Sequence, residues 1–190
     1  MNSSKLSANG AFVSRKRDGS VHIRRKGTVL FGWITIALIS PAIILMGLAE
    51  VEEKGFHGIW ALLFIGGLDA VIIRAGIRGR VILDQDGFVR DVSPLFVTSF
   101  PSSYITSITC KNSGLFINVP DGTHGVWSFA PSLIGGRSAG NARKVITQWL
   151  AETRNTSPAK EAGERKTRML YVTLADVFFL AMPFIATLLV

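Results

Sequence analysis

The chain has 190 residues, of which 48% are hydrophobic, and its 21 basic and 13 acidic side chains give a formal net charge of +8. Its single cysteine, Cys110, excludes an intramolecular disulfide framework and a metal site built from several thiolates. The basic charge does not form the continuous stripe that follows nucleic acid, because it is divided among segments that border apolar blocks. We therefore expect no nucleic acid partner.

Three apolar blocks, at 28–49, 56–73 and 169–190, predict a membrane protein with about three transmembrane (TM) helices. The first block has 22 residues without a charge, which as a helix reaches about 33 Å against a hydrocarbon core of about 30 Å. A cleaved signal peptide is the alternative for this block, since small residues precede Glu50, but its apolar stretch is longer than a typical signal core. A buried core helix is the alternative for the last block.

Basic residues flank these blocks on one side only, and the positive-inside rule then orients the chain. The N-terminus and residues 74–168 are expected to be cytoplasmic, whereas the acidic loop at 49–58 and the C-terminus are expected outside. This predicts a multi-pass protein of the cell membrane that contacts a lipid bilayer with an anionic inner leaflet. The expected membrane-surface basic clusters contain Arg24, Arg25, Lys26, Arg74, Arg78, Arg165, Lys166 and Arg168.

Two carboxylates, Asp69 and Asp176, interrupt the second and third blocks. A charged side chain near the middle of a bilayer costs at least about 2.5–3.5 kcal/mol, so both are candidate intramembrane polar contacts that face protein, water or each other. One interpretation is an ion-coupled site or a contact with a partner subunit. The other is that each carboxylate is shallow enough to reach the interface, or is protonated and bonded to the adjacent helix.

Residues 79–154 are predicted to form one β domain, between the basic tail and TM hairpin (1–27 and 28–73) and a linker at 155–168. Turn signals such as Asp86-Gly87 recur every 8–12 residues or so, which is typical of antiparallel strands in a sandwich or barrel. Only seven basic and five acidic residues occur in this domain, so it is mildly positive.

The hydrophobic period changes to that of a helix over residues 141–153. We expect the apolar stripe of this helix to cover the sheet, with Trp149 buried. Arg143 and Lys144 lie off the stripe and form a candidate docking face. The stripe consists of Ala142, Val145, Ile146, Trp149 and Leu150.

The order of these segments resembles bacterial PH-domain-like integral membrane proteins. A basic N-terminus and an apolar hairpin precede a strand–Asp-Gly–strand segment, a P-x-x-x-I-x-x-I strand (Pro101, Ile105 and Ile108) and a terminal helix. The resemblance covers about residues 80–153 and implies a PH-like antiparallel sheet or barrel of about seven strands, capped by a C-terminal helix. It implies a binding module and no enzyme.

Two features of this chain depart from that family. Members often carry Trp where this chain has Ser102. Lipid-headgroup binding is not carried over, because the tip of the first predicted hairpin, residues 84–86, is acidic where lipid-binding domains of this class are basic.

No set of side chains has the spacing of a catalytic or metal site. His22, His57 and His124 stand apart from one another, and a solvated turn explains His124 near Asp121 better than an acid–base pair. Cys110 is expected to be a packed core thiol. We therefore expect no enzymatic activity, no cofactor and no metal.

The function that these features favour is a membrane-anchored, PH-like protein-interaction or scaffolding module on the cytoplasmic face. Its partner is expected to be a membrane or cytoplasmic protein. The alternative is an accessory subunit or small transporter that works through Asp69 and Asp176.

Overall fold

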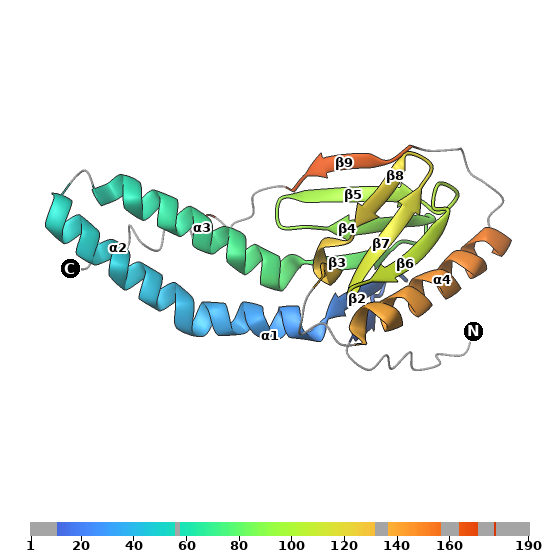
Figure 1. The fold of residues 1–190 in the computed structure, drawn as a ribbon, viewed down its shortest axis with the longest axis horizontal. Helices are drawn as coiled ribbons and strands as arrows, with labels where there is room; N and C mark the ends of the chain where they lie inside the picture. Colours follow the sequence, from blue (N-terminus) through green and yellow to red (C-terminus); the bar gives the residue numbers. More distant parts are fainter. Residues whose placement is uncertain (1–10, 56–57, 132–136, 157–163, 171–176, 178–190) are drawn as a thin grey trace.

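The computed structural model describes residues 11–55, 58–131, 137–156, 164–170 and 177. Two β-sheets and one covering helix form a compact β domain, and a long helical hairpin projects from it (Figure 1). The chain therefore builds two distinct surfaces, one on the sheets and one on the hairpin.

The larger sheet has six antiparallel strands in the order β1-β2-β3-β4-β5-β9. Alternating apolar residues form its inner face, and Ile23, Val81, Val89 and Phe100 are fully buried there. The Asp-Gly turn before β4 places Gly87 at φ 82°, a conformation that favours glycine. The strands are β1 (Ala11–Arg15), β2 (Val21–Arg25), β3 (Arg80–Leu83), β4 (Phe88–Val92), β5 (Phe96–Pro101) and β9 (Lys166–Met169).

The smaller sheet contains β6 (Ser107–Lys111), β7 (Gly114–Val119) and β8 (Gly122–Gly125). The two-residue turn between β6 and β7 uses Asn112 at φ 50° and Ser113 at φ 60°, the left-handed geometry that suits a tight hairpin. A short 3₁₀ helix, η3 (Trp127–Phe129), follows β8.

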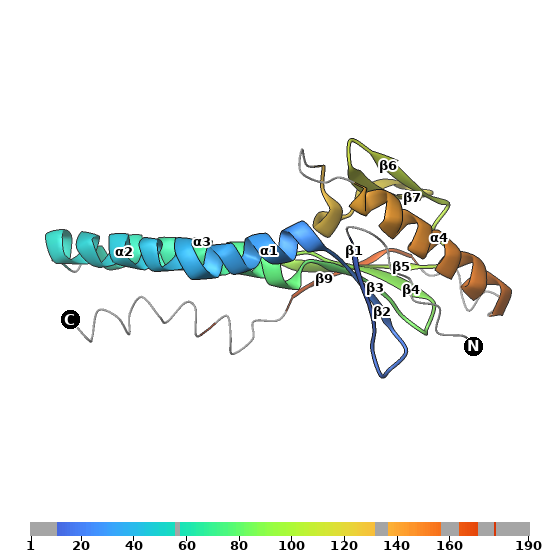
Figure 2. The same cartoon turned by 90° about the horizontal axis from the view of Figure 1, so that it is seen from below.

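Helix α4 (Ser138–Thr156) covers the core between the sheets, and an edge-on view places it with the smaller sheet on one side of the larger sheet (Figure 2). Its stripe packs inward as predicted, and Ile146 is fully buried, but Trp149, predicted to be buried, is only partly buried against the core. Arg143 and Lys144 are exposed on the opposite side. The other inward stripe residues are Ala142, Val145 and Leu150.

The helical hairpin joins β2 to β3, which are neighbours in the larger sheet. Its first arm contains α1 (Lys26–Ile34), a π-helical turn η1 (Thr35–Ile39) and α2 (Ser40–Lys54), and its second arm is α3 (Gly58–Arg78). The arms approach most closely at Gly32 and Gly76, where a Cβ on Gly76 would lie 2.4 Å from the Cα of Gly32. Only glycine fits this crossing.

The prediction of three transmembrane helices is wrong for the part of the chain that the structure describes. No helix there combines the length and the apolar character needed to cross a membrane. The apolar run at 28–49 is divided by the η1 turn, and α3 contains Arg74 and Arg78. The predicted third span, 169–190, lies almost entirely outside the described residues.

The predicted cellular location is also wrong, because it depended on those spans. The inference of a multi-pass cell-membrane protein, with a cytoplasmic tail and domain and an outer C-terminus, required the positive-inside rule to act on three crossings. Without described helices that cross, the positions of the basic clusters no longer fix an orientation.

The larger sheet also extends beyond the predicted domain limits of 79–154. The predicted basic tail contributes β1 and β2, and the predicted linker contributes most of β9. Residues 11–26 add six basic and one acidic side chain to the domain, and residues 164–169 add three basic and one acidic. The β domain is therefore much more basic than its central segment alone.

Candidate functional site

Five cations lie on the outer face of the six-stranded sheet. Side chains alternate between the two faces of a strand, and residues paired across neighbouring strands share a face. The register pairs Ile82 with Arg90, Arg90 with Ser99, and Ser99 with Lys166, so these side chains point away from the core. We call this surface the basic face, and its cations are Arg24, Arg80, Arg90, Lys166 and Arg168.

These cations come from three parts of the chain, β2, the β3–β4 hairpin and β9, which the sheet brings onto one face. Arg24 is on β2, whereas Lys166 and Arg168 are on β9 at the opposite edge (Figure 1). No described helix or sheet covers this side of the larger sheet in the edge-on view (Figure 2). Of the cations on the basic face, Lys166 and Arg168 are exposed, whereas Arg24, Arg80 and Arg90 are partly exposed.

Carboxylates neutralise little of the basic face. Asp84 forms an ion pair with Arg90, whose side chain remains 41% exposed. Among the described residues, Arg24, Arg80, Lys166 and Arg168 have no ion pair with a carboxylate. Burial lowers the pKa of Arg80, and repulsion from Arg24 and Arg78 lowers it further. The cations thus repel one another, which favours a bound anion.

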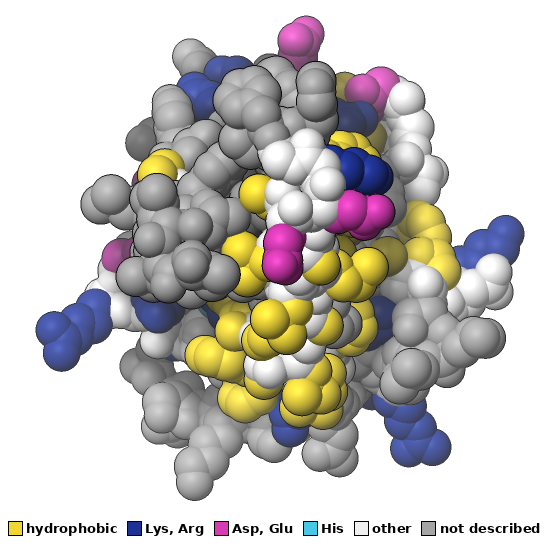
Figure 3. Space-filling view, turned by 90° about the vertical axis from the view of Figure 1, so that its left-hand side faces the viewer, with side chains coloured by type: hydrophobic (Ala, Val, Ile, Leu, Met, Phe, Trp, Pro, Cys, Tyr) yellow, Lys and Arg dark blue, Asp and Glu magenta, His cyan; other side chains and the backbone are white. Residues whose placement is uncertain are grey.

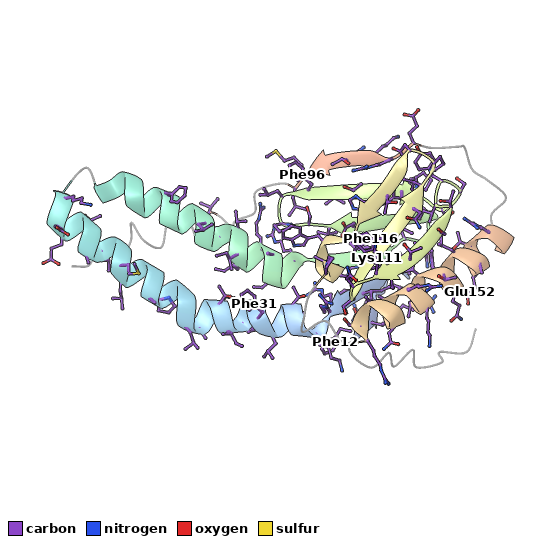
Figure 4. All side chains as sticks on the ribbon, in the orientation of Figure 1. Phe12, Phe31, Phe96, Lys111, Phe116 and Glu152 are labelled. Atoms are coloured by element: carbon purple, nitrogen blue, oxygen red, sulfur yellow. The ribbon has the colours of Figure 1, made fainter. Side chains whose placement is uncertain are left out.

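A pocket of about 270 Å³ opens at the β1–β2 end of the basic face. Side chains from both strands form it, together with Val29 at the start of α1. Phe12, labelled beside the junction of β2 and α1 in Figure 4, forms an apolar wall that is 56% exposed. The lining consists of Phe12, Ser14, Lys16, His22, Arg24 and Val29.

His22 lines this pocket, and a hydrogen bond within the β1–β2 hairpin holds its ring. Its Nε2 atom is 3.1 Å from Ser20 Oγ, and Ser20 in turn donates to Asp18 through both its hydroxyl and its backbone N–H. The buried Nδ1 atom has no hydrogen-bond partner within the described structure. Burial lowers the pKa of His22, and the charges of Arg80, Lys16 and Arg24 lower it further.

A pair of polar side chains connects the two sheets. His124 on β8 lies 2.9 Å from Asp91 on β4, and the backbone N–H of Trp127 donates to the same carboxylate oxygen. The His124 ring also packs against Phe100, with centroids 5.0 Å apart. His124, predicted to lie in a solvated turn, is instead only 17% exposed and faces Asp91 between the sheets. The pair joins the two sheets.

Arg25, predicted to lie at a membrane surface, is instead buried with 8% exposure. Its guanidinium donates to Ser138 Oγ, the Ala130 carbonyl and the Ser113 carbonyl, each at 3.0 Å. It faces inward because it alternates with Arg24 on β2. Arg25 therefore ties β2 to α4 and to the β6–β7 turn, and it is not available to a partner.

The hairpin carries the other unusual surface, which is apolar on several sides. Figure 3 views the molecule from the hairpin end and shows hydrophobic side chains along its described part. Exposed apolar surface of this extent marks an interaction site. Exposed hydrophobic residues of the hairpin include Leu30, Phe31, Trp33, Ile34, Leu38, Leu45, Met46, Phe64, Leu68 and Val71.

The structure does not bring the remaining predicted site residues together. Asp69 falls in α3, but its side chain is outside the described part, as is the whole of Asp176. Arg74 is buried in α3, and Arg143 and Lys144 are on α4, away from the basic face. Of the other predicted cluster residues, Arg24, Lys166 and Arg168 lie on the basic face, Lys26 and Arg165 are exposed, and Arg78 is half-buried.

Cys110 is half-buried, and its thiol donates to the Ala139 carbonyl at 3.3 Å. Burial raises the pKa of this thiol. Among the described residues, no three His, Cys, Asp or Glu side chains are grouped so that they could hold a metal ion.

Sequence reasoning missed the pocket and the Asp91–His124 pair. The alternation of Val21-His22-Ile23-Arg24 was the available signal that residues 21–25 form a strand with a polar outer face.

Comparisons with family models, curated proteins and solved structures gave no match. The resemblance to PH-like proteins therefore stays a prediction.

Proposed function

We propose that this protein is a protein-interaction module that binds an acidic segment of a partner protein on the basic face. The observation that carries the proposal is the grouping of five cations on one open sheet face, of which only Arg90 has a carboxylate neighbour among the described residues. The resemblance to PH-like domains, which implies a binding module, supports the same class of function.

Carboxylate groups suit this surface for a geometric reason. Four of the five cations are arginines, and a guanidinium binds a carboxylate through two parallel N–H donors. Neighbouring strands are about 4.8 Å apart, and alternate side chains of an extended segment point to the same side, so cations on neighbouring strands can engage alternate side chains of an extended acidic segment. The open face and the mutual repulsion of the cations both favour such binding.

The basic face suits a protein segment better than a nucleic acid. Proteins that bind single strands on a sheet stack the bases on exposed aromatic rings. Here the residues between the cations are aliphatic or carry hydroxyl groups, as Ile82, Val92 and Ser99 do, and Phe88 on this face is partly buried at the start of β4. Phe12 stands at the edge, and the Lys26 ammonium lies 5.4 Å from the centre of its ring.

The alternative of an accessory subunit or small transporter depended on Asp69 and Asp176 within membrane spans. Because no described helix can cross a membrane, we do not propose it.

The test measures binding of the full chain to a short fluorescent Glu-rich peptide by fluorescence anisotropy. Lys166→Glu/Arg168→Glu reverses two exposed charges on β9, and exposed pairs contribute about 0.2–1 kcal/mol each. We expect the affinity to fall about tenfold, equivalent to about 1.4 kcal/mol. Higher salt should weaken binding of the unaltered chain, because exposed charges are screened.

Arg143→Glu/Lys144→Glu is the matched control, because it makes the same change in net charge on exposed positions of α4. We expect it to alter affinity less than twofold. Equal losses in both variants would show an effect of net charge alone, and loss only in the control would assign binding to α4. Tighter binding to an RNA oligonucleotide or to anionic phospholipid vesicles than to the peptide would also contradict the proposal.

A further inference from the structure

We propose that the pocket at the β1–β2 end of the basic face binds a phosphate group carried by a phosphorylated side chain of that acidic segment. This inference rests on the proposed function and specifies the partner further. It starts from a cavity of about 270 Å³ that adjoins the basic face. That volume is below the range of about 300–1,000 Å³ for drug-sized ligands, and it suits a single small group.

The lining of the pocket contains several hydrogen-bond donors and no carboxylate. Lys16 and Arg24 bring full positive charges, and Ser14 adds a hydroxyl. The nearest acidic side chain of the hairpin, Asp18, already accepts two hydrogen bonds from Ser20. The lining is therefore electropositive and free of groups that would repel an anion.

His22 strengthens this assignment. Its Nδ1 atom is buried without a partner, while its Nε2 atom is engaged with Ser20 Oγ. Burial and the charges of Arg80, Lys16 and Arg24 lower the pKa of His22. A dianion that enters beside Lys16 and Arg24 offsets those charges, which favours a proton on Nδ1 and adds an N–H donor.

A phosphate ester fits these groups better than a carboxylate does. It carries about −1.5 to −2 charge at neutral pH and three strong acceptor oxygens, so it can engage the ammonium, the guanidinium and the hydroxyl together. The apolar walls, Phe12 and Val29, can contact the carbon atoms that attach the phosphate to its chain. The contact is non-covalent, and no bond is formed or broken.

The experiment compares three Glu-rich peptides that differ at one position, which is serine, phosphoserine or glutamate. With the full chain, we expect phosphoserine to bind at least tenfold tighter than serine and clearly tighter than glutamate. Ser14→Ala/Lys16→Gln should remove this preference, because it deletes two donors of the pocket. Both positions are exposed, so the thermal melt should be unchanged.

Arg17→Gln is the control, since Arg17 is exposed on the same turn but does not line the pocket. It should keep the preference for phosphoserine. Equal binding of the three peptides, or a preference that survives Ser14→Ala/Lys16→Gln, would overturn this inference and leave the proposed function intact. Failure of every peptide to bind would overturn the proposed function itself.

Two further arms distinguish the source of the phosphate. Inorganic phosphate should compete with the phosphopeptide only weakly, because it lacks the contacts of the acidic segment with the basic face. Vesicles that contain a phosphorylated inositol lipid should not displace the phosphopeptide. Displacement by those vesicles, with the same loss in Ser14→Ala/Lys16→Gln, would assign the pocket to a lipid headgroup and contradict a protein ligand.

Discussion

Replacement of Arg25 by methionine removes a buried guanidinium that donates to three acceptors, Ser138 Oγ and the carbonyls of Ala130 and Ser113. A buried acceptor without a partner costs about 1–3 kcal/mol. The losses at the Ala130 and Ser113 carbonyls are partly offset, because the desolvation of an unpaired cation is removed as well, and Ser138 keeps another interaction. We therefore expect a loss of about 3 kcal/mol in the free energy of unfolding, or roughly 6–12 °C in melting temperature for a chain of this size.

Urea denaturation followed by circular dichroism measures this loss, and the dependence on urea should not change if the native fold is kept. Arg24→Met is the matched control, because Arg24 is the preceding residue on β2 and points to the outer face. It should change the free energy of unfolding by less than about 0.5 kcal/mol. Equal effects of the two substitutions, or a loss below about 1 kcal/mol for Arg25→Met, would refute the role of Arg25 as the link between β2 and α4.

Two further predictions concern the β6–β7 hairpin. Ser113→Gly should stabilise the protein by about 0.5–1 kcal/mol, because Ser113 has φ 60° and glycine adopts this conformation without strain; a thermal melt that falls would contradict this. Cys110 should react with a disulfide reagent at neutral pH much more slowly in the folded chain than in urea, because burial raises the pKa of its thiol and so reduces the thiolate fraction. Equal rates in the two conditions would show that the thiol is not protected.

The strands of the central segment follow directly from local sequence. Tight turns at Asp86-Gly87 and at residues 112–113 separate apolar runs, and each run forms a strand. The stripe of α4 is equally local, because helical spacing fixes which residues face the sheet. Local sequence patterns did not predict β9. All four of its residues are exposed, so they show no apolar alternation, and the strand is defined by its backbone pairing with β5.

Overall hydrophobicity was a poor guide to the first apolar run. It predicted one continuous helix, whereas the structure has a π-helical turn at Thr35–Ile39 between two shorter helices. The basic face was beyond prediction for a different reason. Arg24 and Arg168 were both recognised as members of basic clusters, but only the register of six strands places them on one surface.

The position of the helical hairpin within the sheet links the folding of the two parts. β2 and β3 pair directly, yet 54 residues separate them along the chain. Closing a flexible loop of that length would cost about 3 kcal/mol more than closing a two-residue turn. The ordered hairpin avoids much of this entropic cost, because the crossing of Gly32 and Gly76 holds its two ends together. Whatever orders the hairpin therefore also stabilises the pairing of β2 with β3, and thus the pocket and basic face that those strands help to form.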